Sequence, residues 1–125
     1  VVEGHLSPPE GTIDQPLYED QSLTVRVRSH PGAKDARTHY WTRRTSARRS
    51  LVEIHLETGR RHQIRVHMAW SGHPVVGDPR YGQKASRMAL HAQQLVFEHP
   101  VTQKRVVLHT EIPADFSKLL GRAHT

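Results

Sequence analysis

The 125 residues predict an α+β fold with a largely antiparallel sheet. Two segments in the first half alternate apolar and polar residues, which is typical of half-buried strands, and a third strand is expected between them. A helical period follows them, and then two further strands and a short helix. This order lacks the regular alternation of strand and helix that a parallel sheet requires. A chain of this length makes one domain or part of one.

The first strand follows an acidic opening. Residues 1–20 are rich in Pro, Gly and acidic side chains, which predicts a loop or an extended arm. Residues 22–28, "SLTVRVR", place Leu23, Val25 and Val27 on one face. The other face carries two arginines, so this strand is expected to be half-buried with a basic outer surface.

Two more strands precede the helix. A turn at 30–35 leads into a strand at 36–45, "ARTHYWTRRT", and a turn at 46–50 leads into a strand at 50–57, "SLVEIHLE". The apolar face of this last strand comprises Val52, Ile54 and Leu56.

The period changes to that of an amphipathic helix at Arg60. Apolar residues then recur four apart, as Ile64 with Met68 and Val66 with Trp70. The sequence Gly72-His73-Pro74 ends this helix, and residues 75–82, "VVGDPRYG", predict a tight loop. Strands are expected at 89–100 and 104–112, and a C-terminal helix at 113–123 begins at a proline.

Charge is distributed unevenly along the chain, whose net charge is +6. The first twenty residues hold five Asp or Glu and no Lys or Arg. Residues 21–65 hold eleven Lys or Arg and three Asp or Glu, a local balance of +8. Such a basic stripe suits RNA phosphates, although a solvated basic surface has the same composition. No apolar run approaches the roughly 18 residues of a membrane span.

The densest basic segment lies between Glu57 and Asp78, where no carboxylate occurs. A metal, a phosphate backbone and a carboxylate from elsewhere are all possible partners for its arginines and histidines. His62 and His67 are five apart and lie on different helix faces, and the chain has no cysteine, so no metal site is expected. No serine lies in a nucleophile-elbow or triad context.

Residues 58–82, "TGRRHQIRVHMAWSGHPVVGDPRYG", resemble the third signature of the RluA-type pseudouridine synthases. Shorter segments agree in the same order: "EGHL", "IDQPL", "ARTHY", "RMALHAQQLVFEHP" and "PADF". The one small departure is Arg61, where the family usually has Thr or Ser. The resemblance covers nearly the whole chain, and residues 1–125 are expected to form the C-terminal part of such a catalytic domain, with a mixed, mainly antiparallel sheet.

The resemblance implies isomerisation of uridine to pseudouridine in RNA, without any cofactor. The family carries one essential aspartate in an H-R-L-D motif and an arginine that pairs with it. That arginine corresponds to Arg65, the last residue of "HQIR". None of the chain's five aspartates follows H-R-L, so we expect the catalytic aspartate, and the carboxylate that faces Arg65, to lie outside these residues. The chain alone is then expected to be inactive.

Other residues receive roles from the same reading. Candidates for contact with RNA are Arg43, Arg44, Arg48, Arg49, Arg60 and Arg61, although Arg60 also suits a structural pairing beside the turn at Gly59. Candidates for structural roles are His62, Gln63, His67 and Asp78. The first three are expected to hold the helix against the sheet, and Asp78 to stabilise a turn.

The sequence also predicts partners and a location. RNA is the expected partner, together with the missing N-terminal half of the domain or a second copy of the chain, because half a sheet leaves unpaired edges. No membrane is expected, and an intracellular location fits the absence of cysteine. The alternative function is a non-catalytic RNA-binding or assembly module built on the same fold.

Overall fold

The computed structural model describes the chain except for residues 84–86, 91–93, 99–104, 110–115 and 117–125, and it gives 94–98 and 105–109 as backbone. The elements confirm an α+β class with a mainly antiparallel sheet and one helix. The expected C-terminal helix falls on residues outside the described ones, apart from Phe116.

Four strands form the central sheet in the order β1-β6-β5-β2. They are β1 (Val2–Glu3), β2 (Glu10–Asp14), β5 (Arg37–Thr45) and β6 (Arg49–Leu56), and all three pairings are antiparallel. The long pair β5–β6 carries the sheet, with a register shift between Thr42 and Arg44.

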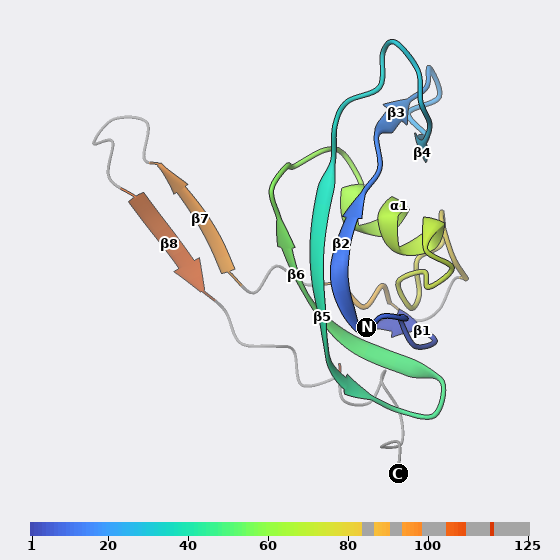
Figure 1. Cartoon of the computed structure of the whole chain (residues 1–125), viewed down its shortest axis with the longest axis vertical. Helices are drawn as coiled ribbons and strands as arrows, with labels where there is room; N and C mark the ends of the chain where they lie inside the picture. Colours follow the sequence, from blue (N-terminus) through green and yellow to red (C-terminus); the bar gives the residue numbers. More distant parts are fainter. Residues whose placement is uncertain (84–86, 91–93, 99–104, 110–115, 117–125) are drawn as a thin grey trace.

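Two hairpins lie outside this sheet. In the first, β3 (Leu17–Glu19) pairs with β4 (Val25–Val27) beyond one end of β2. In the second, β7 (Gln94–Glu98) pairs with β8 (Arg105–His109), as the two late strands predicted. The second hairpin stands apart from the central sheet in Figure 1.

The helix α1 (Gln63–Trp70) lies against one face of the sheet (Figure 1). Its Met68 packs with Ile13 of β2 and Tyr40 of β5 in the main core, and Val52 and Ile54 of β6 pack against the same cluster. Val66, on another side of α1, packs with Leu17 and Val25 of the β3–β4 hairpin in a second cluster. The helix therefore fixes the hairpin relative to the sheet.

Several expected boundaries were wrong. The opening twenty residues contain three short strands rather than a loop, because they find partners in β5, β6 and β4. The strand expected at 22–28 shrinks to β4, and Leu23 lies outside it with a positive φ of 65° and an exposed side chain. At the far end of β6, Leu56 is exposed rather than buried.

The helix also differs from its expected form. It begins at Gln63 rather than Arg60, because His62 adopts a left-handed conformation with φ 55° that no helix can include. Trp70 was expected on the buried face with Val66, but 53% of it is exposed at the end of the helix.

Candidate active site around Arg65

Gln63 fixes the start of α1. Its Nε2 donates to the backbone oxygen of Arg37 at 2.9 Å and to Thr38 Oγ1 at 3.0 Å, both on β5. Its Oε1 accepts from Thr58 Oγ1 at 2.8 Å and from the Arg60 amide at 3.0 Å. A fully used and buried amide side chain thus ties the helix, the preceding loop and the sheet together.

His67 makes the second link between α1 and the sheet. Its ring is buried, with Nδ1 2.7 Å from Thr38 Oγ1 and Nε2 2.9 Å from the backbone oxygen of Gln15. A carbonyl only accepts, so Nε2 carries the proton and Nδ1 accepts from the hydroxyl. Burial lowers the pKa of His67 despite the opposing bond to Gln15, so the ring is neutral near pH 7.

Arg65 and Asp78 form a bidentate ion pair. Arg65 Nε lies 2.9 Å from Asp78 Oδ2, and Nη2 lies 2.8 Å from Oδ1. The Asp78 side chain is fully buried, whereas 16% of the Arg65 side chain is exposed. Burial alone raises the pKa of Asp78, but the bonds from Arg65 and from two amides outweigh it, and the pKa falls below its usual value.

The position of Asp78 depends on Gly77. Gly77 has φ 79°, and a side chain there would collide with the backbone oxygen of Arg87. Asp78 Oδ1 then accepts from the amides of Arg80 and Tyr81, at 3.0 and 3.2 Å. The carboxylate therefore stabilises its own turn, as expected, and also holds Arg65, which was not expected. The expectation that the carboxylate facing Arg65 lies outside these residues was therefore wrong, because Asp78 faces it.

Tyr81 completes the surroundings of Arg65. Its ring lies 5.2 Å from the guanidinium carbon, a cation–π distance. Its hydroxyl lies 2.9 Å from His62 Nδ1 and accepts from the Val25 amide at 3.3 Å. His62 is therefore anchored to the loop after the helix and not to the sheet, which corrects its expected place.

Positive charge exceeds negative charge around this pair. Burial lowers the pKa of His62, and the guanidinium groups of Arg65, Arg61 and Arg80 lower it further, while Asp78 opposes them. Asp78 occupies only one edge of the Arg65 guanidinium. The other edge, which includes Nη1, has no hydrogen bond to a residue that the structure describes. A second anion is therefore the natural complement of this arrangement.

The arginines of the β5–β6 end lie elsewhere. Arg43 Nε is 3.3 Å from Glu53 Oε1, and Arg49 Nη2 is 3.3 Å from Glu3 Oε1. Arg44 and Arg48 are exposed at the same end of the sheet. Of the other two candidates, Arg60 donates from Nε to the backbone oxygen of Asp35 at 2.8 Å, while Arg61 is exposed beside His62.

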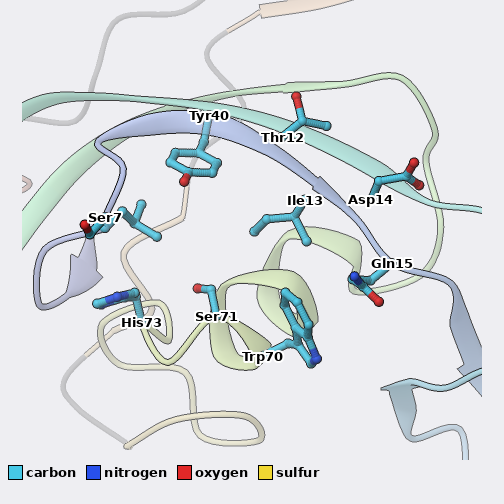
Figure 2. Close-up of a pocket in the computed structure, with 10 residues that line it drawn as sticks. Ser7, Thr12, Ile13, Asp14, Gln15, Tyr40, Trp70, Ser71 and His73 are labelled. Carbon is cyan, nitrogen blue, oxygen red and sulfur yellow. The ribbon is translucent and has the colours of Figure 1, made fainter.

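A cavity of about 310 Å³ lies between β2 and the end of α1 (Figure 2). Several of its polar groups are already engaged: Ser71 Oγ donates to the backbone oxygen of Met68, His73 Nδ1 lies 2.9 Å from that of Glu3, and Asp14 pairs with Arg37. Arg65 does not line it, so this cavity lacks a catalytic constellation.

Among the residues that the structure describes, no three His, Asp or Glu side chains gather as a metal site would require. Within the same part of the chain, no helix has the length and apolar character needed to cross a membrane.

Two residues of the site were given no role from the sequence. Thr38 joins Gln63 to His67, and Arg80 donates to Thr24 Oγ1 at 2.9 Å, which ties the loop to the β3–β4 hairpin. Thr38 lies in the "ARTHY" segment and Arg80 in the motif at 58–82, so the resemblance of these segments to the family could have pointed to both residues.

Comparison with known proteins gives one consistent result. The family model of RNA pseudouridylate synthase matches residues 1–70. The uncharacterized RNA pseudouridine synthase YhcT of Bacillus subtilis is 44% identical over 124 residues, which cover 95% of this chain and 41% of that protein. Ribosomal large subunit pseudouridine synthase D of Escherichia coli is 36% identical over 137 residues, which cover 96% and 42%.

A solved structure agrees. Human RNA pseudouridylate synthase domain containing 1 superposes with a TM-score of 0.80 at 28% identity, over 99% of this chain and 57% of that one. The chain spans less than half the length of these curated relatives.

Proposed function

Because this chain belongs to the RNA pseudouridylate synthase family, we propose that the whole protein isomerises uridine to pseudouridine in RNA and that this chain supplies its catalytic arginine, Arg65. The observation that carries the proposal is the bidentate Arg65–Asp78 pair, which orients the guanidinium and leaves its second edge available.

The reaction calls for a group besides Arg65. Breaking the bond from C1′ to N1 and joining C5 to the ribose calls for a carboxylate at the sugar. Asp14 and Asp20 are paired with Arg37 and Arg26, and Asp78 is buried against Arg65. No aspartate of the chain follows H-R-L. In the proposed enzyme, the catalytic aspartate comes from residues outside these 125.

Arg65 serves that aspartate through its second edge. Three of its five N–H donors remain once Asp78 has taken two, and they suit another carboxylate in a planar contact. An arginine between two carboxylates keeps the catalytic one ionised and correctly turned. Arg61 and Arg80 offset the added negative charge. Asp78 acts only through Arg65 and is a positioning residue.

The test uses the intact protein, this chain alone and an Arg65→Lys variant of the intact protein, each incubated with structured RNA. Pseudouridine is then counted by chemical mapping. We expect turnover by the intact protein, none by this chain alone, and poor turnover by Arg65→Lys, since an ammonium group cannot reproduce the planar, bidentate contact of a guanidinium. Turnover by the chain alone would overturn the need for an outside aspartate. An intact protein that binds RNA without turnover would favour the non-catalytic module.

The same proposal concerns partners. The residues of the intact protein beyond this chain are proposed to complete the domain, since β7 and β8 pair only with each other among the described strands. Without them, this chain is expected to self-associate through open strand edges. Sedimentation of the purified chain tests this, and a monodisperse, stable monomer would contradict it.

A further inference from the structure

A second cavity lies beside the Arg65 site, with a volume of about 460 Å³. Three segments form its walls: the β3–β4 hairpin, the connection from β4 to β5, and the loop from β6 to α1. Its charged lining comprises Lys34, Arg60 and Arg61 against a single carboxylate, Glu19.

The cations of this cavity differ from most others in the chain. Among the Lys and Arg side chains that the structure describes, three have no hydrogen bond, ion pair or ring contact with a described residue: Lys34, Arg48 and Arg61. Two of these three line the same cavity. The third, Arg48, lies in the β5–β6 turn at the opposite end of the sheet (Figure 1).

The lining of this cavity suits an anion with several oxygen atoms. Arg60 is held in the wall by its 2.8 Å bond to the backbone oxygen of Asp35, and its amide is held by Gln63. At Gly59, which also lines the cavity, a side chain would meet no atom within 4 Å. An anchored Arg60 beside two cations without a described partner suits phosphate oxygens, which arginine and lysine both bind.

The cavity is also close to the proposed reaction. Val25 lines the cavity and donates its amide to the hydroxyl of Tyr81, whose ring lies 5.2 Å from the Arg65 guanidinium carbon. The cavity and the Arg65 site therefore share the β3–β4 hairpin as a wall.

We propose that this cavity binds the sugar–phosphate backbone of the RNA beside the target uridine, with Lys34 and Arg61 contacting phosphate oxygens. The inference rests on the proposed function for the identity of the anion. It also moves the main RNA contact away from the β5–β6 end, where Arg43 and Arg49 already pair with glutamates.

The test measures binding of the intact protein to a short oligouridine over a range of salt concentrations. The variants are the double substitution Lys34→Gln with Arg61→Gln, and Arg48→Gln as a matched control that also removes an exposed, unpartnered cation. These side chains make no described hydrogen bond, ion pair or ring contact, so little loss of stability is expected, and a thermal melt checks this. A third variant, Gly59→Asp, adds a carboxylate to the lining of the cavity.

We expect the double variant to weaken binding about tenfold at low salt and to reduce the slope of log K against log salt by about 1.4, at about 0.7 per phosphate contact to a single strand. Gly59→Asp is expected to weaken binding as well, and Arg48→Gln by less than about twofold. The same dissociation constant and slope in the double variant and the unchanged protein would overturn the inference, as would an equal effect of Arg48→Gln.

These outcomes are separable from those of the proposed function, because binding is measured without turnover. An intact protein that binds through this cavity and forms no pseudouridine supports the inference and overturns the function. Turnover with unchanged binding in the double variant does the reverse.

Discussion

Two arginine-rich segments, residues 43–49 and 60–65, look alike in the sequence and differ in the structure. In the first, Arg43 and Arg49 lie on the surface of a strand pair and meet glutamates. In the second, Arg60 and Arg65 are fixed by Asp35 and Asp78, while Arg61 stays open to a cavity.

The difference shows that basic density does not predict where free positive charge lies. The acidic opening of the chain folds back on the basic stripe, so that Glu3, Asp14 and Asp20 pair with Arg49, Arg37 and Arg26. These three pairs cancel part of the local charge imbalance in the sequence. Of the described cations left without a described partner, Lys34 and Arg61 line the second cavity and Arg48 lies in the β5–β6 turn.

The largest effect within this comparison is expected at Asp78. Asp78→Asn leaves Arg65 without its buried, charged partner, which costs about 3–5 kcal/mol of folding free energy. It also lets the guanidinium turn, and a misplaced group of this kind lowers kcat by about a hundredfold. The measurements are denaturant unfolding and single-turnover pseudouridine formation by the intact protein. A positioning role predicts a fall in kcat with little change in KM, and a fall in stability alone would contradict it.

The next effect concerns the turn that presents Asp78. Gly77→Ala forces a side chain into a positive φ and against the Arg87 backbone, and we expect a loss of about 2–4 kcal/mol. Gly59→Ala, in the arginine-rich loop itself, meets nothing within 4 Å and should change stability by less than about 0.5 kcal/mol. Thermal unfolding of both variants measures the difference. Equal losses would show that Gly77 has no special role.

A pH effect is expected at the link between α1 and β5. Burial holds the pKa of His67 below its ordinary value of 6.5, so the folded protein favours the neutral ring. Its contribution to stability is complete above pH 6.5 and is lost as the pH falls from there through the lowered pKa, by up to about 1.4 kcal/mol per pH unit. Unfolding of the intact protein and of His67→Gln between pH 7 and pH 5 would show this as a slope that the variant reduces. Parallel slopes would refute the assignment.

The smallest effect is expected at the paired arginines. Arg43→Gln removes an exposed partner of Glu53, and such pairs contribute about 0–1 kcal/mol. We expect stability to change within that range and binding of oligouridine to weaken by less than about twofold. A tenfold loss of affinity would restore the β5–β6 end as the main RNA contact.

The strand β6 and the helix α1 were predictable from their apolar periods, although Leu56 and Trp70, at the ends of those periods, are exposed. The opening strands were not, since β1 and β3 have two and three residues and draw their hydrogen bonds from strands distant in sequence. The predicted start of α1 was wrong because His62 adopts a left-handed conformation, which no pattern in the sequence predicted.

The site was predictable in its residues and not in its contacts. The motif at 58–82 singled out Arg65 and Asp78, but their pairing spans thirteen positions and depends on the turn at Gly77. The helical period could not predict the contact between the Tyr81 ring and the Arg65 guanidinium. The loop that carries Tyr81 is held by Asp78 and by the β3–β4 hairpin, which lie outside α1 in the sequence.

The most direct test of the central claim compares one arginine from each segment. Arg65→Ala and Arg43→Ala are introduced separately into the intact protein, and pseudouridine formation is measured at saturating RNA. We predict that Arg65→Ala lowers turnover by at least about a hundredfold, or roughly 2.7 kcal/mol, with binding largely retained, and that Arg43→Ala stays within about twofold of the unchanged protein. Equal rates for the two variants, or an Arg65→Ala protein with more than about half of the original turnover, would contradict the account.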